Sequence, residues 1–223
     1  MRNSIKGIIF DLDGVIVFTD ELHFQAWNNL AKDLGIYFDR KINNLLRGVS
    51  RMESLEIVLR EYHGRPLSDL EKIALAEKKN DIYKGLLERM TPEDVSDEVR
   101  RSLRELASRG FKLAIGSSSK NTKRILEKVE LTEVFDAISD GTNIQRSKPD
   151  PEVFIKAAQF LGLEPEACLV VEDADAGIEA AIAAGMYSAA LSPAAKTGKA
   201  DYLLEEFSDL LNIAALNRTE GDR

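Results

Sequence analysis

The stretch Gly7–Phe18, with the sequence GIIFDLDGVIVF, constrains the fold of this chain more than any other. It begins with a short apolar run, Gly7–Phe10, which is β-branched and aromatic and is therefore typical of a buried strand. Two carboxylates, Asp11 and Asp13, follow directly, and Gly14 then allows a sharp turn. Carboxylates at the end of a buried strand are costly unless they are paired or hold a metal. Because open α/β sheets bind ligands at this end of their strands, the stretch predicts a functional site.

Three interpretations of this stretch are open. The simplest is a strand followed by an Asp-Gly turn, because aspartate and glycine favour tight turns. A calcium loop of the EF-hand type needs glycine at loop position six and glutamate at position twelve. Gly14 is only the fourth residue counted from Asp11, and a strand precedes it, so we set that loop aside. The third is a nucleophilic aspartate with Mg²⁺ and a second aspartate as acid/base, which needs partners later in the chain.

The composition is ordinary for a globular protein with a real core. The 223 residues are 44% hydrophobic and 30% charged, which suits one domain or one domain with an inserted subdomain. The formal net charge of −8 argues against non-specific binding to nucleic acid or to acidic membranes. The single cysteine, Cys168, excludes an internal disulfide, and its apolar surroundings predict a buried thiol. No segment resembles a membrane span or a signal peptide, so we expect a cytoplasmic protein.

The pattern of apolar residues divides the chain into two kinds of segment. A helical pattern covers Glu21–Leu34, and two Ser-x-x-Glu capping boxes begin further helices over Ser50–Tyr62 and Ser68–Met90. From about residue 91 onwards, strands alternate with helices, which indicates βαβ units and a parallel sheet. The strands expected there are Phe111–Ile115, Ala137–Asp140, Cys168–Val171 and Tyr187–Leu191.

The sequence therefore predicts an α/β fold with a Rossmann-like parallel-sheet core and an inserted α-helical cap domain. We assign residues 1–17 together with 91–223 to the catalytic core, and residues 18–90 to the helical cap. The linker Thr91–Val95 leads from the cap back into the core.

Three later motifs fall at the carboxyl ends of expected strands, as a shared crevice requires. The first, GSSSKN at Gly116–Asn121, offers hydroxyls, backbone N–H groups and Lys120 to an anion, although a serine-rich helix start is often only a cap. The second, SKPDP, holds Lys148 between Ser147 and Pro149. A lysine before a helix is usually solvated, but the prolines stiffen this segment and favour a fixed counter-charge.

The third motif, LVVEDADAG at Leu169–Gly177, repeats the pattern of the first strand. An apolar run ends in Glu172 and Asp173, and a glycine follows in the next helix. Acidic residues at such a position can be plain helix N-caps. Two acidic strand ends in one sheet would repel each other unless a cation lies between them, and hard oxygen ligands suit Mg²⁺. The four motifs together are more specific than any one of them.

With these motifs the chain resembles the haloacid dehalogenase superfamily over essentially its whole length. DLDGV at residues 11–15, the Ser117 site, Lys148 with its proline, and ED at residues 172–173 look like the four motifs of that superfamily. Within it, the chain is most similar to the β-phosphoglucomutases. That closer likeness lies in Thr19-x-x-x-His23, Trp27, RGVSR at residues 47–51, Ser54, KKND at 78–81, SSKN at 118–121 and DAGI at 175–178.

The resemblance implies roles for the residues of the core. Asp11 would be the nucleophile that becomes an aspartyl phosphate, and Asp13 would be the general acid/base. Ser117 and Lys148 would hold the transferring phosphoryl oxygens and balance their charge. Asp13 would bind the metal through its backbone carbonyl. The Mg²⁺ ligands implied in this way are Asp11, Asp13, Glu172 and Asp173.

The resemblance also implies a substrate-binding set. A mutase needs a second phosphate site, and the arginine of that site suits it through bidentate geometry. The distal phosphate would bind Arg51, Ser119, Lys120 and Asn121. His23 and Lys79 would couple substrate binding to Asp13; without the resemblance they are a surface histidine and a solvated lysine. The other implied substrate contacts are Thr19, Gly48, Val49, Ser50, Ser54, Ser118 and Trp27, the last of which is otherwise a core residue.

The function implied by the resemblance is that of a magnesium-dependent isomerase. It would interconvert β-glucose 1-phosphate and glucose 6-phosphate through glucose 1,6-bisphosphate. The rival is a sugar-phosphate phosphatase with the same nucleophile, metal and cap. A phosphonate hydrolase fits less well, because no cap lysine is evidently placed for a Schiff base. A non-catalytic phosphosugar-binding regulator would have no need of a nucleophile.

One departure from the superfamily pattern concerns the hinge into the cap. The superfamily usually has an acidic residue at the position of Phe18, and that residue would brace the hinge. Its replacement leaves the catalytic groups in place but puts the closure of the cap in doubt. We expect a monomer that binds a small phosphosugar and neither nucleic acid nor membrane.

Overall fold

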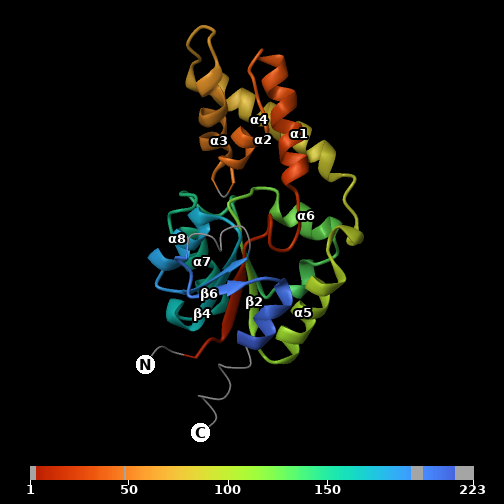
Figure 1. Cartoon of the computed structure of the whole chain (residues 1–223), viewed down its shortest axis with the longest axis vertical. Helices are drawn as coiled ribbons and strands as arrows, with labels where there is room; N and C mark the ends of the chain where they lie inside the picture. Colours follow the sequence, from red (N-terminus) through yellow and green to blue (C-terminus); the bar gives the residue numbers. More distant parts are fainter. Residues whose placement is uncertain (1–3, 48, 192–197, 214–223) are drawn as a thin grey trace.

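The computed structural model of the chain describes residues 4–47, 49–191 and 198–213. Within these residues, parallel strands form one sheet in the order β3-β2-β1-β4-β5-β6 (Figure 1). The strands are β1 Gly7–Phe10, β2 Lys112–Gly116, β3 Ala137–Ser139, β4 Cys168–Glu172, β5 Tyr187–Leu191 and β6 Tyr202–Leu204. This sheet confirms the predicted α/β fold. Because β1 pairs with both β2 and β4, the segment after it leaves the middle of the sheet's carboxyl edge.

Helices cover both faces of this sheet, because successive residues of a strand point to opposite sides. The helices are α5 Asp97–Ser108, α6 Thr122–Lys128, α7 Glu152–Leu161 and α8 Asp175–Ala183. Ile8 and Phe10 of β1 belong to a core cluster with residues of α5 and α6. Ile9 belongs to a second cluster, formed with residues of α7 and α8. Burial on both faces explains why the strands read as continuous apolar runs.

The remaining helices lie together above the carboxyl edge of the sheet (Figure 1). They are α1 Asp20–Asp33, α2 Arg40–Asn44, α3 Arg51–Val58 and α4 Asp69–Leu87. An apolar cluster of their own, which includes Trp27, Leu30 and Leu55, packs between them. We therefore keep the division into a core of residues 1–17 and 91–223 and a cap of residues 18–90 as a proposal. No helix in the described part of the chain is long and apolar enough to cross a membrane.

Both capping boxes expected in the cap are present. Ser50 Oγ accepts the N–H of Glu53 at 3.2 Å, and the Glu53 carboxylate accepts the N–H of Ser50 at 2.8 Å. The same exchange joins Ser68 and Glu71 at the start of α4. Helix α3 ends earlier than predicted, because the chain tightens into a 3₁₀ turn, Leu59–Glu61, directly after it.

Two elements were not predicted from the sequence. Helix α2 is only five residues long, and Asp39 is its N-cap, whose carboxylate accepts the N–H of Ile42 at 2.9 Å. Strand β6 is three residues long and lies at the edge of the sheet, beside β5. Segments this short contain less than two turns or two strand periods, so their apolar pattern does not distinguish them from loops.

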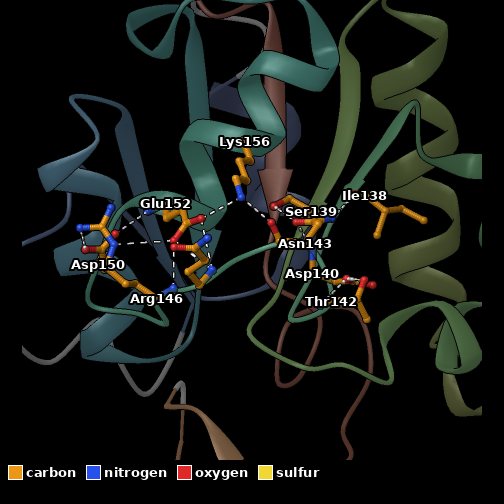
Figure 2. Close-up of polar contacts among 10 residues, drawn as sticks. Ile138, Ser139, Asp140, Thr142, Asn143, Arg146, Asp150, Glu152 and Lys156 are labelled. Atoms are coloured by element: carbon orange, nitrogen blue, oxygen red, sulfur yellow. Dashed lines mark hydrogen bonds and ion pairs between the residues drawn. The ribbon is translucent and has the colours of Figure 1, made fainter.

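The segment between β3 and α7 is held to the first turn of α7 by Glu152 (Figure 2). The Glu152 carboxylate accepts the backbone N–H groups of Gln145, at 3.1 Å, and of Arg146, at 2.9 Å. It also forms an ion pair with Lys156 at 2.8 Å, one turn further along α7. The chain runs from this loop straight into Lys148, so Glu152 helps to set where that lysine enters the core.

The centre of the sheet provides a stability test. Phe10 is fully buried, and its ring lies 6.2 Å from that of Phe135 and 5.7 Å from that of Phe207. We expect Phe10→Ala to lower the free energy of unfolding by about 3–5 kcal/mol, because it leaves a cavity between these rings. Chemical denaturation measures the loss. Phe160→Ala, at a side chain that is 54% exposed, is the control and should cost about 1 kcal/mol or less.

Replacing Glu152 with glutamine tests the loop anchor as a function of pH. Hydrogen bonds from Lys156 and from the Arg146 backbone lower the pKa of Glu152 from 4.5 to about 2. Because the folded-state pKa lies below the unfolded one, the carboxylate stabilises the fold fully above pH ~4.5 and loses its effect toward pH ~2. The Tm difference between wild type and Glu152→Gln should therefore shrink across that window. A difference that stays constant down to pH ~3 would contradict the assignment.

Candidate active site

One pocket of about 680 Å³ lies between the carboxyl edge of the sheet and the cap helices. The residues predicted from the sequence that line it from the core are Asp11, Asp13, Ser117, Ser118, Ser119, Lys120, Asn121, Glu172 and Asp173. Those that line it from the hinge and the cap are Thr19, His23, Trp27, Val49, Ser50, Arg51, Ser54 and Lys79. Lys148 lies beneath the pocket wall, and Gly48 lies outside the described residues. The fold thus brings together residues from three strand ends, from the loop before α7 and from three cap segments.

The ammonium of Lys148 lies at the base of the pocket with no exposure to solvent. Its Nζ is 2.5 Å from Oδ1 of Asp11 and 2.5 Å from Oε1 of Glu172. Burial opposes its charge, but the two carboxylates outweigh that effect and raise the pKa of Lys148 above its ordinary value. Lys148 is therefore a permanent cation against Asp11, as a counter-charge for a nucleophilic carboxylate should be.

Three buried carboxylates converge beside this lysine. Asp11, Glu172 and Asp173 each offer an oxygen within 4.8 Å of the others. Burial, followed by repulsion from Glu172 and Asp11, raises the pKa of Asp173. Glu172 is occupied by Lys148 and by the N–H groups of Asp173 and Ala174, both at 2.9 Å. This excess of hard oxygen donors over positive charge fits Mg²⁺, with Asp11 and Asp173 the better placed ligands.

Two glycines allow the carboxylates to approach so closely. Gly14 has φ +98°, and a Cβ there would lie 2.2 Å from Oδ2 of Asp173. A Cβ at Gly177 would lie 1.9 Å from Oε1 of Glu172. The glycines of the first and last motifs therefore leave room for the clustered carboxylates.

Asp13 has a different environment from Asp11. Its side chain does not belong to the carboxylate cluster. The metal contact expected through its backbone carbonyl stays a prediction. Thr19 donates a hydrogen bond to Oδ1 of Asp13. Burial, followed by repulsion from Asp11, raises the pKa of Asp13 to about 6. A carboxyl with that pKa exchanges protons readily near neutral pH, which suits a general acid/base.

The serine-rich segment after β2 forms an ordered polar wall. Ser117 Oγ accepts the N–H of Ser119 at 3.1 Å, and Ser119 Oγ accepts the N–H of Asn121 at 3.2 Å. The Asn121 amide donates to Oδ1 of Asn80, in cap helix α4, at 2.9 Å. This buried contact was not predicted, because it depends on the placement of the cap over the core.

The cap contributes a buried lysine. Lys79 is only 3% exposed, and its Nζ lies 3.0 Å from Nδ1 of His23 and over the rings of Trp27 and Tyr83. Burial, followed by repulsion from Arg51, lowers the pKa of Lys79 to about 7. Burial and Lys79 also lower the pKa of His23, so its neutral ring accepts the hydrogen bond. The alternative of a solvated lysine is therefore wrong, and His23 is half-buried against Lys79 and the Tyr83 ring. Trp27 belongs both to the cap core and to the pocket wall.

Arg47 makes a contact whose importance the sequence analysis missed. Its guanidinium lies 3.2 Å from Oδ2 of Asp173 and 3.3 Å from Oδ1 of Asp20. Asn43 donates to the same Asp20 oxygen at 3.0 Å. Arg47 belongs to the RGVSR motif at residues 47–51, and this motif could have indicated from the sequence that Arg47 lies at the site. Phe18, where the superfamily usually has an acid, is 71% exposed at the pocket, while Asp20 provides a carboxylate two residues later.

Known proteins are similar in sequence to the chain that builds this site. The family model of the haloacid dehalogenase-like hydrolases matches residues 5–185. The β-phosphoglucomutase of Bacillus subtilis is 39% identical over 208 residues, which are 92% of each chain. The fructose-1-phosphate phosphatase YqaB of Escherichia coli is 32% identical over 187 residues, which cover 83% of this chain and 96% of that protein. The relatives thus include a mutase and a phosphatase.

A solved structure extends the similarity to three dimensions. The crystal structure of β-phosphoglucomutase from Clostridium difficile matches with a TM-score of 0.89 at 34% identity. The match covers 98% of this chain and 100% of that one. The resemblance inferred from the motifs is therefore confirmed. The chain belongs to the haloacid dehalogenase-like hydrolase family of enzymes.

Proposed function

We propose that this enzyme is a magnesium-dependent phosphosugar mutase that interconverts β-D-glucose 1-phosphate and D-glucose 6-phosphate. The observation that carries the proposal is that one pocket of about 680 Å³ contains both the carboxylates and separate cationic groups. A glucose 1,6-bisphosphate intermediate needs a reacting and a distal phosphate site at once, and a pocket of this volume holds a ligand of that size. The similarity to the β-phosphoglucomutase of Bacillus subtilis supports the same reaction.

In this reaction Asp11 carries the phosphoryl group. One of its carboxylate oxygens bonds to phosphorus while the bond from phosphorus to the sugar oxygen breaks. Lys148, 2.5 Å from Asp11, balances the charge of the carboxylate and of the phosphoryl oxygens, and the Ser117 hydroxyl donates to those oxygens. Bound Mg²⁺, held by Asp11 and Asp173 with the carbonyl of Asp13, would neutralise phosphoryl charge in the transition state.

Asp13 moves the proton in each half of the reaction. Its carboxylate takes the proton of the sugar hydroxyl that attacks phosphorus, and the bond between phosphorus and Asp11 breaks. In the other half it gives a proton to the leaving sugar oxygen. The pKa of about 6 allows both steps near neutral pH. The hydrogen bond from Thr19 holds the Asp13 carboxylate in place.

The distal phosphate site holds the end of the sugar that is not reacting. The bisphosphate turns over between the two half-reactions, so that each phosphate in turn faces Asp11. The residues proposed for the distal site are Arg51, Ser119, Lys120 and Asn121. Closure of the cap over the pocket excludes water, so that the phosphoryl group of Asp11 passes to the sugar.

A sugar-phosphate phosphatase is the second candidate function. The similarity to the fructose-1-phosphate phosphatase YqaB, over 96% of that protein, favours it. The nucleophile, the metal ligands and the acid/base are the same in both functions. The two differ in whether water or a sugar hydroxyl accepts the phosphoryl group from Asp11.

A product assay separates the two functions. With β-glucose 1-phosphate, Mg²⁺ and a trace of glucose 1,6-bisphosphate, glucose 6-phosphate should form with little free phosphate. Chelation of Mg²⁺ should stop the reaction, and excess Mg²⁺ should restore it. Asp11→Asn should lower kcat by roughly 10³-fold or more, because amide nitrogen and oxygen are poor nucleophiles. Stoichiometric release of free phosphate would identify a phosphatase instead.

Arg51→Ala tests the distal phosphate site. We expect the apparent affinity for glucose 1,6-bisphosphate to fall by roughly 10- to 100-fold, since a charged hydrogen-bonding partner of the phosphate is lost. The measurement is the bisphosphate concentration that half-activates the mutase reaction. Arg65→Ala is the control, because Arg65 pairs with Glu71 on the exposed cap surface. Equal activation of Arg51→Ala and wild type would remove Arg51 from the site.

A further inference from the structure

Arg51 already has an anionic partner in the pocket. Its Nη1 lies 2.7 Å from Oε1 of Glu77, so helix α3 is joined to helix α4 by an ion pair. Both side chains line the pocket. The Arg51 side chain is 19% exposed, whereas that of Glu77 is 57% exposed and faces open solvent on its other side. The carboxylate of Glu77 thus occupies one of the guanidinium donors that a phosphate would use.

Two other charged groups act on Arg51, besides the Glu77 carboxylate that is hydrogen-bonded to it. Asp81 also attracts the guanidinium, and Lys79 repels it. Burial lowers the pKa of Arg51, although the group remains a cation. Glu77 is the carboxylate in hydrogen-bond contact with it, which makes Glu77 the group that an incoming phosphate meets first.

The pair between Arg51 and Glu77 has a counterpart on the same two cap helices. A second ion pair, between Glu56 of α3 and Lys72 of α4 at 2.8 Å, joins the same two helices. Glu56 is 54% exposed, close to the value for Glu77, and it does not line the pocket. Of the two carboxylates, Glu77 is therefore the one that a ligand in the pocket can meet.

We propose that Glu77 sets the affinity for the distal phosphate by competing with it for Arg51. This inference rests on the proposed function, in which Arg51 binds the phosphate that is not reacting. A phosphate that reaches the guanidinium must either displace the Glu77 carboxylate or stand beside it, and both arrangements cost binding free energy. Glu77 consequently weakens retention of the doubly charged group and favours the release that lets the bisphosphate turn over.

The test is the binding of glucose 1,6-bisphosphate by isothermal titration calorimetry with Mg²⁺ present. Asp11→Asn serves as the background, because it prevents turnover during the titration. Adding Glu77→Gln should lower Kd by about three- to fivefold, the effect of one half-exposed ion pair. Adding Glu56→Gln, the matched control on the same two helices, should leave Kd unchanged. Thermal unfolding of each variant checks that its fold is retained.

A double-mutant cycle identifies the route of the effect. In a background that also carries Arg51→Ala, Glu77→Gln should give less than half of its gain in affinity, since the guanidinium for which it competes is absent. A full gain in that background would show general repulsion by Glu77 and overturn competition for Arg51. An unchanged or higher Kd in Glu77→Gln alone would also overturn the proposal.

The outcome does not depend on the mutase assay. Glucose 6-phosphate formation together with an unchanged Kd in Glu77→Gln would leave the mutase function standing and remove Glu77 from it. Release of free phosphate together with a lower Kd would keep Glu77 as a control of phosphate affinity in a phosphatase. Should the Asp11→Asn variants fail to fold, the same comparison can be made with Asp11 intact. The glucose 1,6-bisphosphate concentration that half-activates the mutase reaction should then be about three- to fivefold lower in Glu77→Gln than in wild type.

Discussion

The buried ammonium of Lys148 is the interaction on which the rest of the site depends. It lies between Asp11 and Glu172, which come from different strand ends. Lys148 and Arg47, which lies against Asp173, are two cations beside three buried carboxylates, and uncompensated buried charge is costly. The remaining negative charge fits a hard divalent cation, and Lys148 places a positive charge 2.5 Å from Asp11. The balance between these carboxylates and cations is therefore set by the protein's own residues, without a substrate.

The cap completes this site through polar contacts that reach into the core. Arg47 lies against Asp173, and Asn80 of the cap binds Asn121 of the core. The cap therefore contacts both the carboxylate cluster and the polar wall after β2. The relatives include a mutase and a phosphatase, and in the proposed function the choice between water and sugar as acceptor depends on groups such as Arg51 that the cap supplies.

Much of the fold follows from local physical chemistry. The strands are buried on both faces, so they read as continuous apolar runs, and the capping boxes at Ser50 and Ser68 appear where the sequence places them. Elements without such a signature were missed: α2 and β6 are too short for a period to show. The partners of Arg47 and Asn80 were missed for another reason, since each lies on a different element, far away in the sequence.

The sequence by itself determined which residue types stand at the strand ends: two acidic tips, a hydroxyl segment and a proline-flanked lysine. Those types follow from what each strand must bury and from the turn that must end it. Only the tertiary structure decided which partners the charged residues of the pocket have and how far those residues are buried. Lys79 is buried beside His23 rather than solvated, because α1 and α4 pack against each other. Arg51 pairs with Glu77, because α3 lies beside α4. Burial and pairing are properties of the assembled pocket, and no single segment contains them.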